Sequence, residues 1–191
     1  SSLADYHYLQ LMREPLTFDQ LVGAEYVNFS DKSCVMPSTD AGDWQTAYSN
    51  NILRAGKHYV SFTPILNDGN VGFGVMRPGQ ANQYAIGAPD ENGFFENFHQ
   101  RLDAGEHNNN SVQYYAFTGN CYSSDWEDSS EVEARTDTWN GMESTSSGDE
   151  MGMLLDLDKG TLTVYKNGRK LGVMKSGLAG PYCWVVSMYC E

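Results

Sequence analysis

Two aspartates separated by one leucine, Asp156 and Asp158, could in principle bind calcium or act as an acid–base pair. A calcium ion needs about six or more oxygen ligands, usually gathered by a loop with several carboxylates. The two aspartates instead flank Leu157 at the end of an apolar run. We therefore interpret Asp158 as a turn-forming residue, a common role for aspartate, and Asp156 as the partner of a neighbouring backbone group or cation.

Glu131 and Glu133 have a spacing that could serve glycoside hydrolysis, a reaction that needs two facing carboxyl groups about 5–10 Å apart. They lie in a polar, serine-rich stretch and not on an aromatic strand. This position does not favour a glycosidase.

Histidine and cysteine show no catalytic or metal-binding spacing. The four histidines stand at positions 7, 58, 99 and 107, and the four cysteines at 34, 121, 183 and 190, with no CxxC pair. The chain also lacks a GxSxG elbow and a phosphate-binding P-loop. We predict no catalytic residue, no metal and no cofactor, and hence a protein that is not an enzyme.

Scattered cysteines in a chain of this size are more often free and buried than paired. They favour a reducing, intracellular and cytoplasmic location. Two glycosylation sequons, which begin at Asn28 and Asn109, leave secretion open. No apolar run reaches transmembrane length.

The charge balance limits the classes of partner. Twelve Lys and Arg stand against 25 Asp and Glu, a formal net charge of −13 over 191 residues. Such a chain repels nucleic acid and anionic membranes. We expect no contact with either, and a basic protein or peptide partner is easier to accommodate than an acidic one.

The elements that must position any site are clearest in the last third of the chain, residues 148–189. Apolar residues 151–157 precede Asp158-Lys159-Gly160, and β-branched residues 161–166 precede Asn167-Gly168. Asn-Gly between two strand-like runs is a strong hairpin signal, because both residues tolerate the positive φ of a type I′ turn. The Asp-Lys-Gly turn fits a three-residue hairpin, so this region predicts a meander of at least three antiparallel strands.

Strand signals recur upstream, at 25–29, 58–63, 71–76, 112–118 and 132–135. In the run VGFGVM, Val71, Phe73 and Val75 share one face, while Gly72 and Gly74 occupy the other. Glycines on one strand face usually mark close approach of a bulky side chain or another backbone. Residues 3–13 could form a short helix that Pro15 ends. Many short strands with little helix predict an all-β sandwich or barrel.

Five segments, in order, resemble the SPRY domain family. They are SNNILRAGKHYVSF (49–62), DGNVGFGVM (68–76), YYAFTGN (114–120), the run GDEMGMLLDLDKGTLTVYKNGRKLGV (148–173) and GLAGPYCWVVSM (177–188). The DLDKGTL…YKNG spacing is the most distinctive part. Val60 replaces a usual Trp and Val164 a usual Phe, which predicts a repacked core and not a lost fold.

The resemblance implies a bent sandwich of two antiparallel sheets, of the jelly-roll or concanavalin-like type, over residues 25–191. Residues 1–24 are expected to form a helical or extended arm, packed on the sandwich or serving as a linker. Family members are usually non-enzymatic modules that bind a protein or peptide through loops at one end of the sandwich. The chain would then be a monomeric domain or part of a larger multidomain protein.

Aromatic and charged residues in the loops are the candidate contacts, because Tyr, Trp and Arg dominate interface hot spots. Asp40 and Asp43 make a ligand with Lys or Arg plausible. A carbohydrate-binding, lectin-like module is the alternative. The predicted ligand-binding residues are Asp43, Trp44, Arg77, Pro78, Tyr84, Trp126 and Tyr189.

Overall fold

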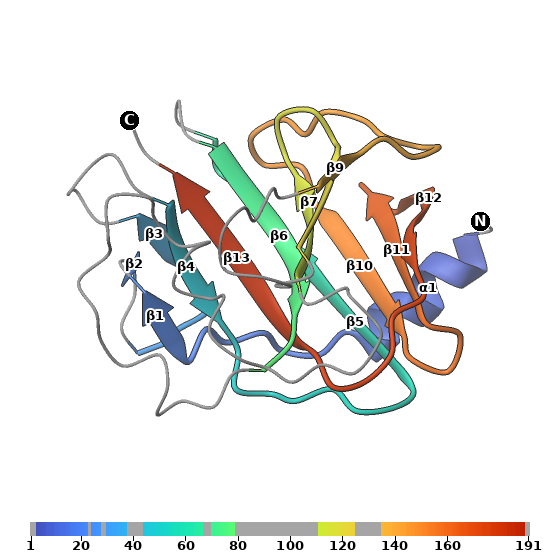
Figure 1. Cartoon of the computed structure of the whole chain (residues 1–191), viewed down its shortest axis with the longest axis horizontal. Helices are drawn as coiled ribbons and strands as arrows, with labels where there is room; N and C mark the ends of the chain where they lie inside the picture. The colour runs from blue at the N-terminus through green and yellow to red at the C-terminus, as the bar shows by residue number, and fades with distance from the viewer. Residues whose placement is uncertain are drawn as a thin grey trace.

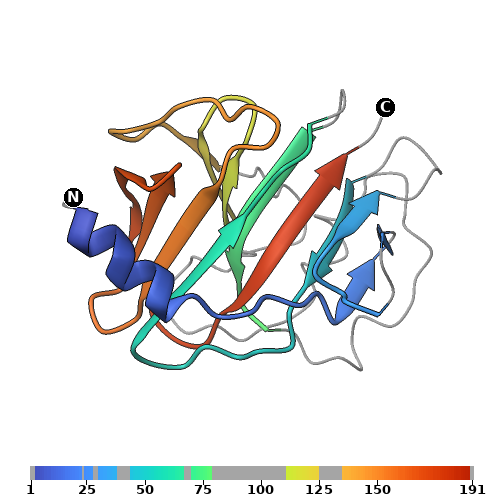
Figure 2. The same cartoon turned by 180° about the vertical axis from the view of Figure 1, so that it is seen from behind.

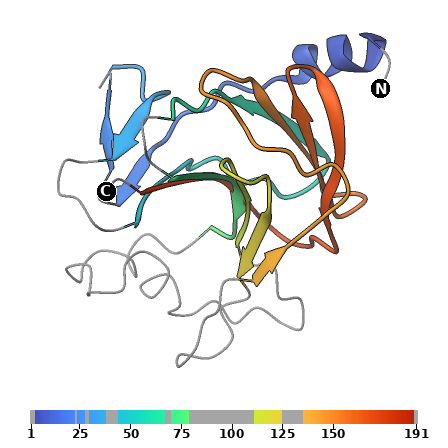
Figure 3. The ribbon, with the colours of Figure 1, turned by 90° about the horizontal axis from the view of Figure 1, so that it is seen from above.

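The computed structural model describes residues 3–22, 24–27, 30–37, 44–66, 70–78, 111–124 and 135–189. Most of its strands form two antiparallel sheets, whose strands are labelled in Figure 1. Viewed from above, the two layers are distinct, and the helix α1 lies on the outer side of the smaller sheet (Figure 3). The predicted all-β sandwich of two antiparallel sheets with a short helical arm is confirmed.

The smaller sheet has the strand order β12-β11-β10-β5. These strands span Arg169–Ser176, Thr161–Lys166, Met151–Asp156 and Lys57–Phe62. The predicted meander is confirmed, because β10, β11 and β12 pair in sequence. Both turns have the expected backbone: φ is +49° at Asn167 and +77° at Gly168, and +64° at Gly160.

The larger sheet has the order β1-β4-β13-β6-β7-β8-β9. Its strands are Gln20–Val22, Trp44–Tyr48, Cys183–Tyr189, Asn70–Met76, Ser111–Tyr115, Cys121–Ser124 and Arg135–Asp137. A separate pair joins β2 (Ala24–Tyr26) and β3 (Val35–Pro37). Residues before position 25 therefore supply a helix and the edge strand β1.

The glycines of β6 allow close approach of the neighbouring strand β7, as the sequence predicts. A Cβ at Gly74 would overlap the backbone carbonyl of Val112, and one at Gly72 would lie 2.9 Å from Gln113 Oε1. Only glycine lets β7 approach β6 this closely.

The core between the sheets contains a row of packed aromatic rings among aliphatic side chains. Phe62 stacks on Phe73 with centroids 5.0 Å apart, and Phe73 stacks on Tyr114 at 5.5 Å. Trp184 meets Phe62 edge-on at 6.4 Å. Val60 and Val164, the two departures from the SPRY pattern, are both buried in this core, so the substitutions keep the sites apolar.

The helix α1 (Leu3–Met12) crosses the outer face of the smaller sheet (Figure 2). Leu9 is buried against Tyr59 and Tyr165, and the chain then continues along β5, where Glu14 N donates to Tyr59 O at 3.0 Å. Within the described ranges, no helix is long and apolar enough to cross a membrane.

Candidate functional site

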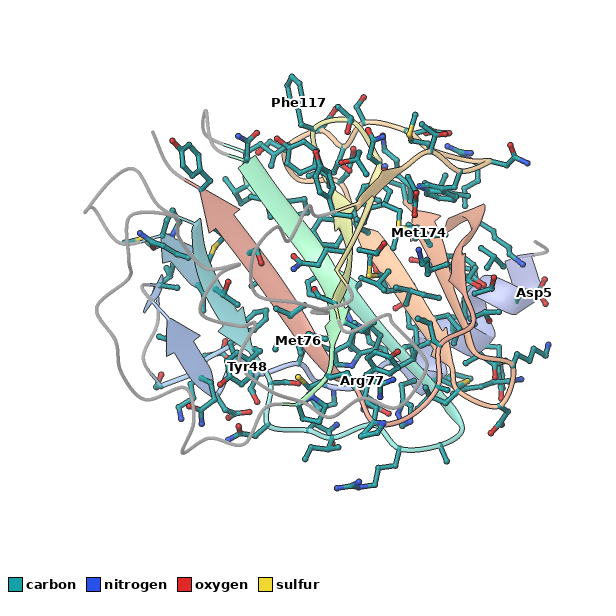
Figure 4. All side chains as sticks on the ribbon, in the orientation of Figure 1. Asp5, Tyr48, Met76, Arg77, Phe117 and Met174 are labelled. Carbon is teal, nitrogen blue, oxygen red and sulfur yellow. The ribbon has the colours of Figure 1, made fainter. Side chains whose placement is uncertain are left out.

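The two ends of the larger sheet are distinct surfaces. Strand β6 runs from Asn70 to Met76, and β13 runs antiparallel to it, so Tyr189 pairs with Asn70 and Cys183 with Met76. Six residue steps at about 3.3 Å each separate these ends by roughly 20 Å. Figure 4 shows Phe117 beyond one end of the sheet and Arg77 at the other.

The surface at the Phe117 end consists of residues 63–66, 116–120 and 138–150, and we call it the loop end. A tight turn follows β7 because Gly119, at φ +78°, lets its N–H donate to Tyr115 O at 2.7 Å. Ala116 lies between two neighbours: its N–H donates to Val71 O at 2.9 Å, and its carbonyl accepts from Thr145 N at 2.8 Å. The turn is therefore fixed by backbone hydrogen bonds.

Three large apolar side chains are exposed at the loop end: Phe117 is 71 % exposed, Ile65 63 % and Met142 37 %. The 63–66 loop is held beside the 146–148 turn, because Gly148 N donates to Pro64 O at 2.9 Å. The chain thus presents apolar side chains on a rigid backbone, an arrangement that favours a binding surface over a flexible linker.

Of the predicted ligand-binding residues, Tyr189 and Trp44 belong to this same end. They are cross-strand partners at the end of β13 and the start of β4. Asn70, the other neighbour of Tyr189, accepts a hydrogen bond from Tyr115 at 2.5 Å. The Tyr115 ring lies edge-on to Phe117, with centroids 6.5 Å apart. This chain of neighbours connects Tyr189 to Phe117.

Arg77 and Pro78 lie at the opposite end, so the structure does not bring them together with Tyr189. The Arg77 guanidinium donates to Ala179 O at 2.6 Å and lies over the Tyr182 ring, 5.1 Å from its centroid. Arg77 therefore stabilises the position of the 177–182 segment.

Asp43, Tyr84 and Trp126 lie outside the described residues, as do Glu131 and Glu133. Sequence reasoning missed Phe117, Ile65 and Met142. The available signal for Phe117 was the Thr118-Gly119-Asn120 sequence directly after it, which marks a turn.

Asp156 pairs with a backbone N–H and a cation, as the sequence predicts, and Asp158 lies in the turn over residues 157–160 but bonds to a distant loop. Asp156 Oδ1 accepts from Lys159 N at 3.1 Å, and its other oxygen lies 4.0 Å from Lys57 Nζ. Asp158 Oδ1 accepts from Gly56 N at 3.2 Å. Among the described residues, no group of three or more His, Cys, Asp or Glu side chains is arranged to hold a metal ion.

The titratable groups with resolved shifts are all held in their ordinary states. Burial raises the pKa of Cys121 to about 11 and that of Cys183 to about 12, so both thiols stay protonated. Burial likewise raises the pKa of Tyr114 and Tyr182.

Comparison with known proteins identifies the fold. No protein-family model matches the chain, and no curated protein sequence matches it. The TRIM65 PSpry domain matches over 100 % of this chain and 99 % of its own, with a TM-score of 0.54 and 16 % identity. The SPRY domain of human HERC1 matches over 78 % and 76 %, with a TM-score of 0.48 and 16 % identity. A human SPRY domain matches over 91 % and 96 %, with a TM-score of 0.44 and 14 % identity.

The full-length match to the TRIM65 PSpry domain, together with the strand order, shows that the chain has the SPRY β-sandwich fold. This confirms the resemblance carried by the five sequence segments. At 16 % identity the match concerns the fold alone.

Proposed function

We propose that the chain is a non-enzymatic protein-interaction domain that binds a peptide or protein partner at the loop end. The observation that carries this proposal is Phe117, a large apolar side chain 71 % exposed on a turn with fixed backbone hydrogen bonds. A preformed anchor loses little conformational freedom on binding, and such anchors contribute most of the affinity of an interface.

The surroundings of Phe117 support recognition of a protein surface. Ile65 and Met142 are also exposed at the loop end, and Glu143 of the loop end forms an exposed ion pair with Arg169 at 2.7 Å. An apolar centre with a charged rim is the usual composition of a protein interface. The net charge of −13 favours association with a basic partner, and Tyr189 and Trp44 remain proposed contacts at this end.

The SPRY fold supports the proposal by analogy, since the same fold hosts binding modules. The described residues give no specific support to a lectin, so we carry no second function forward. A glycan array, with and without calcium, tests that alternative directly, and specific glycan binding would replace our proposal.

The proposal is tested by selecting peptides from a displayed random library on the wild-type domain and measuring their affinities by calorimetry. Phe117→Ser is expected to weaken the selected peptides by about thirtyfold, the effect of a hot-spot residue worth about 2 kcal/mol. Tyr189→Ala is expected to weaken them as well. Val173→Ser, at a residue of β12 that is 46 % exposed, is the matched control and should leave affinity unchanged.

Thermal unfolding of each variant shows whether the fold is intact. If Phe117→Ser and Tyr189→Ala both fold and bind every selected peptide as the wild type does, the loop end is not the binding site.

A further inference from the structure

A second surface lies on the other side of the molecule, between α1 and the smaller sheet. It is a groove of about 290 Å³. Its floor is formed by Leu9 and Met12 of the helix and by Leu154 and Tyr165 of the sheet. This volume lies just below the ~300–1,000 Å³ range of small-molecule sites, so it suits one large apolar side chain and not a whole ligand.

Two lysines line the groove from opposite edges of the sheet. Lys57 is on β5 and Lys170 on β12, three strands apart. The strand registers also offset them by four residues along the strands. Strand spacings of about 4.8 Å and residue steps of about 3.3 Å place their Cα atoms roughly 20 Å apart. Both lysine side chains line the groove, each from its own edge of the sheet.

Lys170 stands out from the other cations of its strand. Arg169 pairs with Glu143 at 2.7 Å, and Lys175 pairs with Asp137 at 3.1 Å. Lys170 makes no hydrogen bond or ion pair within the described part of the chain, whereas Lys57 forms a long ion pair with Asp156 at 4.0 Å. A protein with a net charge of −13 thus places two lysines beside one apolar groove, and one of them, Lys57, is also paired with Asp156.

We propose that this groove binds an extended acidic segment of a partner protein, with one apolar side chain inserted between two carboxylates. In an extended chain, residues i, i+2 and i+4 point to the same side. An acid–x–apolar–x–acid segment therefore directs all three side chains at the groove. Its two acidic positions are about 13 Å apart along the backbone, and their side chains reach outward toward Lys57 and Lys170.

Asp5 and Tyr8 also affect which ligands the groove can bind. Tyr8 lines the groove and is 59 % exposed, so it can cover the inserted side chain. Asp5 also lines the groove and opposes a carboxylate ligand. Because the whole domain is acidic, long-range repulsion disfavours highly charged ligands, while screening over about 8 Å at physiological salt leaves the close lysine contacts effective. A ligand with two carboxylates flanking one apolar residue carries little total charge and can still contact both lysines.

The test uses a fluorescent peptide, Ser-Glu-Thr-Leu-Thr-Glu-Ser, titrated with the intact chain in a polarisation assay. The wild type is expected to bind with a Kd below ~1 mM, the weak range that one apolar anchor and two rim ion pairs allow. Replacing both Glu by Gln, or Leu by Ser, should weaken binding by about five- to tenfold.

On the protein side, the double variant Lys57→Glu/Lys170→Glu should lose about tenfold or more in affinity. Lys159→Glu, an exposed lysine in the turn after β10, is the charge control and should stay within about twofold. Asp5→Asn should tighten binding by about twofold. Phe117→Ser should have no effect, which keeps this test independent of the loop end.

The proposal is overturned if the wild type does not bind at 1 mM, if the Gln peptide binds equally well, or if the double lysine variant folds and binds unchanged. It is also overturned if light scattering shows that the double variant changes the oligomeric state, because the groove would then contact a second copy of the chain. Weaker binding by Asp5→Asn contradicts the assigned charge preference.

Discussion

Tyr59 of β5 and Tyr165 of β11 meet edge to face beneath α1, with ring centroids 6.0 Å apart and an interplanar angle of 87°. Leu9 of the helix packs against both rings. Burial raises the pKa of both hydroxyl groups, so both rings stay neutral through the physiological range. This aromatic pair is the surface on which the helix is held.

Leu9→Ala is expected to release α1 from the sheet. Leu9 is 5 % exposed, and truncation of a buried leucine costs about 2–5 kcal/mol. A terminal helix can separate without unfolding the sandwich, so faster amide hydrogen exchange in residues 5–12 is the sensitive measurement. Leu11→Ala, at a residue that is 88 % exposed, is the matched control and should change stability by less than about 0.5 kcal/mol. Equal exchange rates in both variants would contradict this packing.

Gly74→Ala and Gly72→Ala should differ strongly, although both glycines lie on the same face of β6. A Cβ at position 74 overlaps the backbone carbonyl of Val112, which cannot move without separating two strands. We expect a loss of about 3 kcal/mol or more. At position 72 the neighbour is the end of the Gln113 side chain, which can shift, so the loss should be about 1 kcal/mol. Urea unfolding of both variants tests this order.

Local chemistry explains why so much of the fold could be predicted from sequence. Asn167 and Gly168 specify their turn by themselves, and alternation in β6 assigns its two faces without any distant contact. The groove under α1 could not be predicted in the same way. It joins residues such as Leu9 and Leu154, which are more than a hundred positions apart, and no local pattern indicates their contact.

The loop end shows a second limit of sequence reasoning. The apolar and aromatic run 112–118 predicts one strand through Thr118, but β7 ends at Tyr115. Gly119 adopts a positive φ and closes a turn over residues 116–118. Phe117 therefore leaves the sheet and becomes exposed. Because β7 ends three residues earlier than predicted, Phe117 is a candidate contact and not a structural residue of the sheet.

The cysteines should differ in reactivity at pH 8. Burial raises the pKa of Cys121 to about 11 and that of Cys183 to about 12, and only the thiolate reacts. Cys34 is exposed. In a Cys190→Ser background, we expect one thiol to react rapidly with an aromatic disulfide reagent and two to react only after denaturation. Rapid reaction of three thiols in the native protein would contradict their burial.

Asp149 should contribute stability that depends on pH. Asn167 Nδ2 and Ser146 N donate to its carboxylate at 2.8 and 2.7 Å, and Lys166 Nζ lies 3.2 Å away. These hydrogen bonds, and then the lysine, lower its pKa below the usual 3.8. The contribution is therefore complete above the pKa of Asp149 in the unfolded chain, which is about 4. It is lost as the pH falls through the lower pKa of Asp149 in the folded state.

Asp149→Asn removes this contribution. We expect the variant to be about 1–2 kcal/mol less stable than the wild type at pH 7, with a difference that narrows below pH 3.8. Urea unfolding at pH 7, 4 and 3 measures it. A difference that grows toward acid would have the wrong sign for a lowered pKa.

Glu150, the residue before β10, accepts hydrogen bonds from Tyr6 and Gln10 at 3.3 Å and lies 3.9 Å from Arg13. Tyr6 and Gln10 stand at positions i and i+4 on one face of α1, and Arg13 directly follows the last residue of the helix. Rotating or sliding α1 by one residue would break all three contacts together. In mechanical terms, tension applied at α1 passes through the Glu150 carboxylate into β10, in addition to the Leu9 contacts with Tyr59 and Tyr165, and β10 is braced by β5 and β11 on either side. The helix is thus mechanically coupled to an interior strand of the smaller sheet.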